Sequence, residues 1–97
     1  MAKRYGAAIK QLVEQHPADW ITFIGLPPGR VEVVDADLSA VSPAADKVIR
    51  VEAAEPYIAH LEFQASSDIE FDRRMLMYNA LLRWRHKLPV KSVAVVH

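Results

Sequence analysis

The eight residues Tyr57–Gln64 alternate in polarity with the period of a β-strand. Successive side chains in a strand point to opposite faces of a sheet, so His60, Glu62 and Gln64 share one face. A carboxylate and an amide that project side by side from a rigid strand offer the oxygen ligands that Mg²⁺ favours, provided that a second carboxylate comes from a neighbouring strand. The simpler interpretation is an antiparallel strand whose polar face lies in solvent.

The segment after this strand predicts a helix and then a final strand. Ser67 can cap the helix, acidic residues follow in its first turn, and basic residues precede Pro89 at its end. A strand, a helix and a further strand in this order form a right-handed crossover, so we expect Val90–His97 to run parallel to an earlier strand. The helix face expected to pack on the sheet contains Phe71, Met75, Tyr78 and Leu82.

The chain before Tyr57 predicts helical segments and then a meander of short strands. The expected elements are an amphipathic helix over Met1–His16, a short helical turn within Ala18–Gly25, a turn at Leu26–Gly29, strands over Arg30–Leu38 and Lys47–Glu52, and a hairpin at Ala53–Pro56. The expected fold class is therefore α/β, in the form of an α+β mixed sheet of about four strands with helices packed against it.

Length and composition predict one domain over residues 1–97. The chain has 97 residues, 52% of them hydrophobic, which is enough for one core and too few for two. The apolar content exceeds what one small domain readily buries, so we expect a homodimer. Cysteine is absent, which excludes disulfides and thiolate metal sites. The sequence shows no signal peptide and no apolar run of membrane length, so we expect a soluble, cytoplasmic protein.

The formal net charge of zero bears on nucleic-acid binding. A neutral chain has no global basic field, so contact with DNA would depend on a local patch. The basic group Arg83, Arg85, His86 and Lys87 is such a patch, or it complements the negative end of the helix dipole.

The carboxylate expected to join Glu62 is Asp46, because Asp46 stands at the start of the strand that precedes the hairpin. Asp35 and Asp37 are alternatives, although they fall in what reads as an ordinary loop. Glu14, on the first helix, is either a more distant carboxylate near the same site or an exposed side chain.

Other residues near the expected site have both a structural and a functional interpretation. His60 shares the Glu62 face, where it is either a hydrogen-bonded structural residue or a ligand. Arg73 or Arg74 could meet a phosphate, or could pair in solvent with an acidic residue one turn away. Tyr78 is expected in the core.

The second half of the chain contains four short motifs, Ala45–Val48, His60–Gln64, Arg73–Asn79 and Leu88–Val93. Together they resemble the core of the PD-(D/E)XK nuclease superfamily, and within it the branch of recombination-promoting nucleases and putative transposases. The resemblance covers about Asp46–His97, a little over half of the chain, and rests on the four motifs together, in order and at natural spacing. It implies a restriction-endonuclease-like core made of a helix, a three-stranded meander, a helix and a strand.

The activity that this resemblance implies is hydrolysis of a DNA phosphodiester by metal-activated water. Asp46 and Glu62 would hold Mg²⁺ or Mn²⁺, and the carbonyl of Phe63 would complete the inner shell. Gln64 would position water or a phosphate oxygen.

The sequence departs from the superfamily signature at two positions. Ala45 replaces a proline that is not a ligand. Gln64 replaces a lysine, and a neutral glutamine can hydrogen-bond but cannot offset the negative charge of a phosphate. The alternative function is therefore a catalytically inactive nuclease-fold domain that acts as a binding or dimerisation module.

Overall fold

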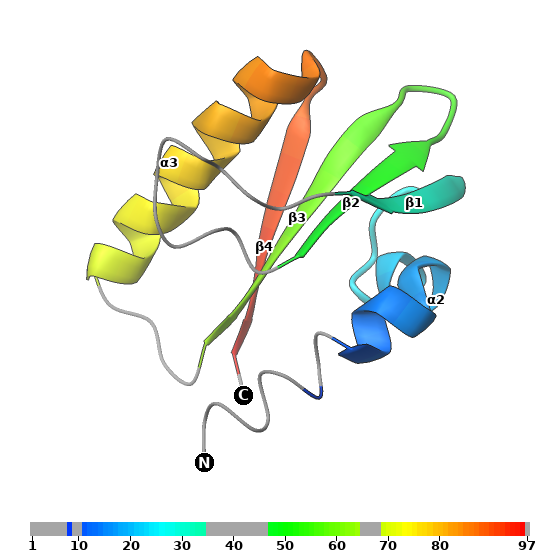
Figure 1. Ribbon diagram of the computed structural model, residues 1–97, viewed down its shortest axis with the longest axis horizontal. Helices are drawn as coiled ribbons and strands as arrows, with labels where there is room; N and C mark the ends of the chain where they lie inside the picture. The colour runs from blue at the N-terminus through cyan, green and yellow to red at the C-terminus, as the bar shows by residue number, and fades with distance from the viewer. Residues whose placement is uncertain (1–7, 9–10, 35–46, 65–68, 97) are drawn as a thin grey trace.

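A four-stranded sheet with helices on either side forms the body of the protein (Figure 1). The computed structural model describes residues 8, 11–34, 47–64 and 69–96. The elements in chain order are α2 (Pro17–Phe23), β1 (Arg30–Val34), β2 (Lys47–Glu52), β3 (Tyr57–Gln64), α3 (Ile69–His86) and β4 (Val90–Val96). Residues 11–15, ahead of α2, are also helical.

The strands lie in the order β1-β2-β3-β4, which makes β3 an inner strand. The first three strands form the expected antiparallel meander, with Val31 opposite Val51 and Val51 opposite Tyr57. The fourth strand runs parallel to β3, with Ile58 opposite Val90, because α3 carries the chain back along the sheet. The predicted mixed sheet and the predicted parallel pair are both confirmed.

Helix α3 packs on one face of the sheet because one of its sides is apolar. Phe71, Tyr78 and Leu82 are buried on that side, as their helical spacing predicts. Tyr78 and Leu82 join a core cluster whose strand members are Val48, Ile58 and Val90. Even-numbered residues of β2 and β3 therefore face α3.

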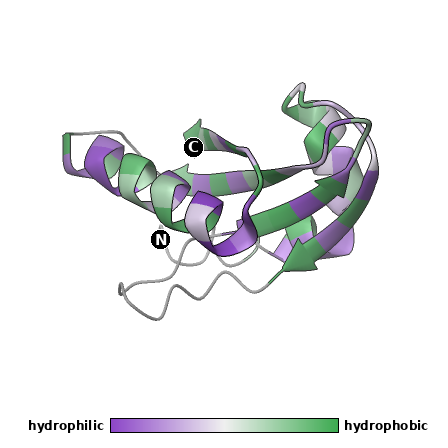
Figure 2. Cartoon of the chain, turned by 90° about the horizontal axis from the view of Figure 1, so that it is seen from above, coloured by the Kyte–Doolittle hydropathy of each residue, from purple (hydrophilic) through white to green (hydrophobic). Residues whose placement is uncertain are grey.

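The odd-numbered residues of β2 and β3 face the other side of the sheet, where α2 and the helical residues 11–15 lie. Val13 and Ile21 are fully buried there in a cluster with Ile49, Val51, Tyr57, Ala59, Leu61 and Phe63. The Trp20 ring meets the Phe63 ring edge to face, with 5.9 Å between ring centroids. Strand β3 is thus buried on both faces, and Figure 2 shows hydrophobic stretches along the strands interrupted by hydrophilic bands.

Two glycines bring the chain from α2 into the sheet. Gly25 has φ of 78° just after α2, in the left-handed region that side chains disfavour. Gly29 lies against the β2–β3 turn, and a Cβ atom there would come within 2.6 Å of the Glu52 carbonyl oxygen. A residue larger than glycine at position 29 would therefore force β1 away from β2.

Several expected boundaries shift in the structure. The first helical segment ends at Gln15, just before Pro17 and close to the expected end at His16, and Pro17 then begins α2, because a proline is well accommodated at the first helical position. The strand expected over Arg30–Leu38 is described as Arg30–Val34, and the rest of that range lies outside the described residues, as does Ser67. None of the helices that the structure describes is long and apolar enough to cross a membrane.

Candidate functional site

The polar residues of β3 lie beneath α3 and are buried. His60 is fully buried and Glu62 is 6% exposed, so the interpretation of Glu62 as part of a solvated strand face is wrong. The register explains the burial, because His60 is flanked by Val48 of β2 and Ser92 of β4, and Tyr78 of α3 covers its ring at a centroid distance of 5.8 Å.

A chain of polar contacts connects α3 to Glu62. Asn79 on α3 donates from Nδ2 to the Ser92 hydroxyl at 2.9 Å and to the Val90 carbonyl at 3.0 Å. The Ser92 hydroxyl lies 2.8 Å from Nδ1 of His60. On the other side of the ring, Nε2 of His60 lies 3.4 Å from an oxygen of the Glu62 carboxylate. Four side chains from three elements thus meet in one row.

The directions of these contacts favour one tautomer of His60. The Ser92 hydroxyl accepts from Asn79, so its own proton is available to donate to Nδ1 of His60. A neutral imidazole whose Nδ1 accepts carries its proton on Nε2, on the side of Glu62. Nε2 makes no hydrogen bond to any described residue, because the 3.4 Å contact lacks hydrogen-bond geometry. Nε2 of His60 and an oxygen of the Glu62 carboxylate therefore lie 3.4 Å apart beneath α3, and both residues are buried.

The partner expected for Glu62 is not described, because Asp46 lies outside the described residues. Its neighbour in sequence, Lys47, pairs with Leu61, the neighbour of Glu62. The described residues contain no group of three or more histidine, cysteine, aspartate or glutamate side chains able to hold a metal ion. Near Glu62 they supply one carboxylate, because the His60 nitrogen that faces Glu62 carries a proton and is not a ligand.

The other contributors expected on β3 are the carbonyl of Phe63 and the side chain of Gln64. Phe63 pairs with Val95 of β4, and its side chain belongs to the core cluster on the α2 side of the sheet, which does not test the role expected for its carbonyl. Gln64 pairs with Val96 at the end of β3, and its side chain lies outside the described atoms. Asp35 and Asp37 are also outside the described residues.

Glu14 is not beside Glu62. Its carboxylate forms an ion pair with the Lys47 ammonium on the α2 side of the sheet, and its side chain is half exposed. Glu62 lies on the α3 side, so the sheet separates the two carboxylates. The structural interpretation of Glu14 holds.

The two arginines of the third motif also have local partners. Arg73 bonds to Glu70 at 3.1 Å in solvent, as the structural interpretation expects. The Arg74 guanidinium lies 5.6 Å from the centre of the Phe71 ring. Neither contact brings an arginine to His60 or Glu62.

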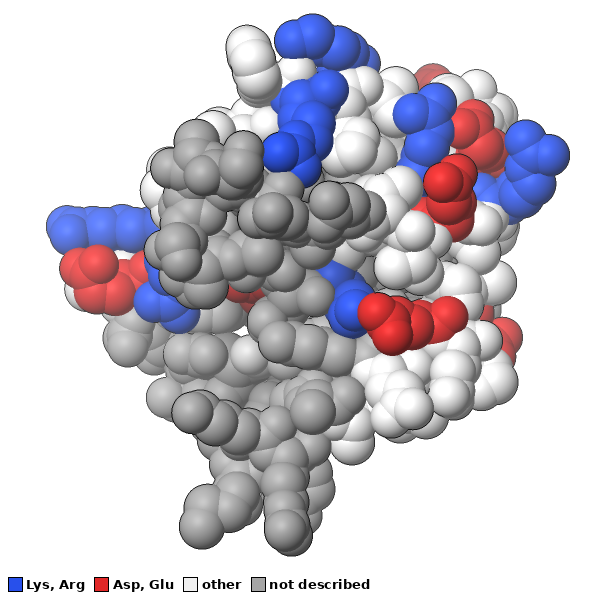
Figure 3. All heavy atoms as spheres, in the orientation of Figure 1, with Lys and Arg blue, Asp and Glu red and all other residues white. Residues whose placement is uncertain are grey.

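The basic residues at the end of α3 complement the helix terminus. Lys87, with φ of 59°, donates its ammonium to the Trp84 carbonyl at 2.7 Å and lies over the Trp84 ring. Burial lowers the pKa of His86 below 6.5, and the charges of Arg85 and Arg50 lower it further. In Figure 3 basic side chains at the top of the view stand without acidic neighbours, whereas basic and acidic side chains are intermixed over the rest of the described part of the face shown.

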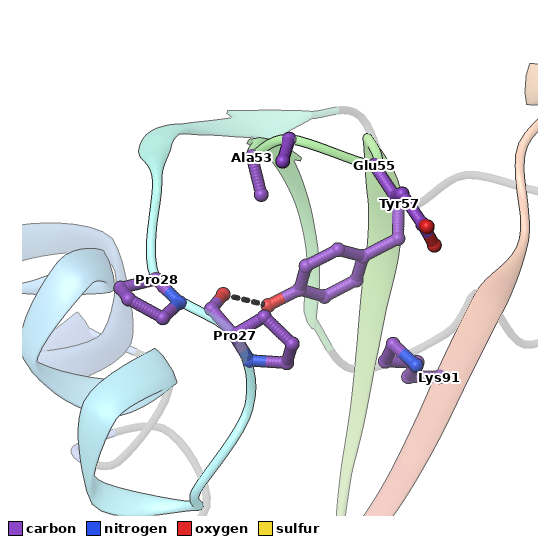
Figure 4. A pocket seen from close by; sticks show the side chains of 7 residues that line it. Pro27, Pro28, Ala53, Glu55, Tyr57 and Lys91 are labelled. Atoms are coloured by element: carbon purple, nitrogen blue, oxygen red, sulfur yellow. Dashed lines mark hydrogen bonds between the residues drawn. The ribbon is translucent and has the colours of Figure 1, made fainter.

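A pocket with a volume of about 340 Å³ lies at the other end of β3 from Glu62, where no sequence motif predicts a site (Figure 4). Tyr57 lines it and donates its hydroxyl to the Pro27 carbonyl, while the Lys91 ammonium lies 5.5 Å from the ring centre. Burial raises the pKa of the Tyr57 hydroxyl. Tyr57 is at the start of β3 and belongs to the core cluster on the α2 side, whereas Glu62 faces α3, so the two features are separate.

Sequence reasoning also missed the roles of Ser92 and Asn79. The signal for Ser92 is a polar residue between Val90 and Ala94, on the face of the last strand that is otherwise apolar. Because β4 lies parallel to β3, this serine falls opposite His60.

In comparisons with known proteins, no family model, no curated protein and no solved structure matches this chain.

Proposed function

We propose that this protein hydrolyses DNA phosphodiesters with the help of a divalent cation held by Glu62 and Asp46. The observation that carries the proposal is the antiparallel register of β2 and β3, in which Lys47 lies opposite Leu61. Asp46 precedes Lys47 and Glu62 follows Leu61.

The order of elements supports the same proposal. A three-stranded antiparallel meander, a crossover helix and a parallel fourth strand are the arrangement that the resemblance to PD-(D/E)XK nucleases implies. In that arrangement Glu62 and Gln64 come from the inner strand β3, which lies between β2 and β4.

The chemistry of the donor set suits Mg²⁺ or Mn²⁺. Carboxylate oxygens are hard ligands, and a neutral chain leaves a cation as the main positive charge available to a phosphate. When bound, the cation supplies Lewis-acid stabilisation of the phosphoryl oxygens and a more acidic water. The row from Asn79 to His60 orients the Glu62 side chain, since the imidazole lies against its carboxylate.

The burial of Glu62 favours a second candidate, a non-catalytic domain that retains this fold and acts by binding. The Glu62 side chain is 8% exposed and His60 is 0% exposed, so both groups could serve the packing of α3 alone. Glutamine instead of lysine at position 64 points in the same direction.

Cleavage of supercoiled plasmid DNA with Mg²⁺ or Mn²⁺ separates the two candidates. We expect Glu62→Gln and Asp46→Asn to lower the rate by roughly 100-fold or more, because loss of a metal ligand costs several kcal/mol of transition-state stabilisation. Glu55→Gln is the matched control, since Glu55 is exposed in the β2–β3 turn and should leave the rate unchanged.

Gln64→Lys tests the departure from the superfamily signature. If glutamine substitutes for lysine in positioning water, the variant should cleave at least as fast as the natural protein. If neither the natural protein nor Gln64→Lys cleaves DNA with either cation, the binding module takes the place of the nuclease.

A further inference from the structure

Helix α3 carries a second apolar stripe, on the side that faces away from the sheet. Ile69 is 62% exposed, Leu76 and Trp84 are each 74% exposed, and Met77 is 38% exposed. With 3.6 residues per turn, these residues and Ala80 fall within about a third of the helix circumference, opposite the buried side. We call these five residues the outer stripe. A helix that is apolar on two sides has a face that the described fold leaves uncovered.

We propose that the outer stripe is the interface of a homodimer in which α3 packs antiparallel against α3 of a second copy. A two-fold axis perpendicular to α3, at the level between Leu76 and Met77, places Leu76 of one copy opposite Met77 of the other. It also places Ile69 of one copy opposite Trp84 of the other, so apolar side chains meet at the centre and at both ends. A surface that is complementary to itself in this way is what a two-fold dimer requires.

The charges beside the outer stripe fit the same partner. Asp72 and Arg83 are eleven residues apart, which is three helical turns, so they lie on the same flank of α3. The two-fold axis brings Asp72 of one copy near Arg83 of the other, twice per dimer. Parallel packing of the helices would place this flank of the two copies on opposite sides of the interface, where Asp72 and Arg83 could not pair, so the charge pattern selects the antiparallel arrangement.

One charged residue, Arg73, lies among the residues of the outer stripe on the same face of α3, and its surroundings accommodate it. Arg73 already bonds to Glu70 of its own helix at 3.1 Å, which neutralises its charge. The residue that faces Arg73 across the axis is Ala80, which leaves room for a long side chain. The Arg73 stem can therefore pack across the interface while its guanidinium stays with Glu70.

An interface of one helix face is small, so the dimer should be weak. We expect dissociation constants of the order of micromolar to tens of micromolar, typical of interfaces at the lower end of the size range. Analytical ultracentrifugation of the whole chain from about 1 to 200 µM should show the mass rising from 10.9 kDa towards twice that value.

A substitution at the centre of the outer stripe tests its location. Leu76→Glu should weaken dimerisation by about tenfold or more, because it buries two charges near the axis. Phe23→Glu is the matched control, since Phe23 is 78% exposed on α2 and lies outside the outer stripe. Both variants should keep the far-ultraviolet circular dichroism of the natural chain, because both residues are exposed.

Charge reversal tests the antiparallel geometry. Asp72→Arg and Arg83→Asp should each weaken the dimer by about threefold to tenfold, because each places like charges together twice. The variant with both reversals restores opposite charges across the interface and should recover most of the affinity. In a chain without cysteine, dissolved oxygen with a copper catalyst should oxidise two Leu76→Cys chains to a disulfide-linked dimer, and the same oxidant should not link Phe23→Cys chains.

Three results would overturn the proposal. The first is a natural chain that stays monomeric up to 200 µM. The second is a dimer that Phe23→Glu weakens as much as Leu76→Glu does. The third is a double reversal of Asp72 and Arg83 that remains as weak as the single reversals.

Discussion

Removal of the Ser92 hydroxyl should destabilise the protein far more than loss of one hydroxyl usually does. Ser92→Ala takes away the group that bonds both to Nδ1 of His60 and to Asn79. Asn79 keeps its hydrogen bond to the Val90 carbonyl, so it loses only one of its two hydrogen bonds. His60 is 0% exposed, so water cannot replace the contact to Nδ1.

The expected magnitude follows from these contacts. A buried polar atom left without a partner costs about 1–3 kcal/mol, whereas the partial loss at Asn79 adds a few tenths of a kcal/mol. We therefore expect the free energy of unfolding to fall by about 2 kcal/mol. For a domain of this size the melting temperature should fall by roughly 10 °C.

Urea unfolding followed by circular dichroism measures this change, with Thr22→Ala as the control. Thr22 also donates a hydroxyl bond, to the Ala18 carbonyl, but in an exposed position where water can take its place. Its loss should change stability by about 0.5 kcal/mol or less. A cycle with His60→Leu should show that the Ser92 and His60 effects are coupled. Additive effects, or a neutral Ser92→Ala, would refute the buried row of contacts.

Three further predictions concern the core, the end of α3 and the Tyr57 pocket. Leu82→Ala should cost about 2–5 kcal/mol, measured by the same unfolding, because Leu82 is fully buried between α3 and the sheet. Because its pKa is lowered in the folded state, His86 gives full stability above pH 6.5, and stability should decline as the pH falls from 6.5 towards the lowered pKa. His86→Gln should reduce that decline in unfolding curves at about pH 7.5 and 5.5, and an unchanged decline would contradict it. Tyr57→Phe should lower stability by about 1 kcal/mol, since it loses the bond to the Pro27 carbonyl, and a neutral result would count against that bond.

The fold could be predicted because its elements have clear local signals. The alternation of Tyr57–Gln64 identified β3, and the charge gradient along Ile69–His86 identified α3. The parallel placement of β4 was predicted from the right-handed crossover that a strand, a helix and a further strand form. These are properties of short stretches and their order, which is the information that a sequence carries directly.

The surroundings of Glu62 could not be predicted, because they depend on packing between distant elements. Alternation placed His60 and Glu62 on one face but did not show that α3 covers that face. The roles of Ser92 and Asn79 depend on the register of β4 and on the rotation of α3, neither of which has a local signal. The outer stripe of α3 was missed for the same reason, since its exposure is known only once the buried side is fixed.

Calorimetric titration of the protein with Mn²⁺ and Mg²⁺ tests the central claim most directly. We expect saturable binding at one site per chain. Glu62→Gln and Asp46→Asn should abolish it, and Glu55→Gln should leave it unchanged, because only the first two remove a proposed ligand. Absence of binding by the natural chain, or equal binding by all three variants, would contradict a cation site at Glu62.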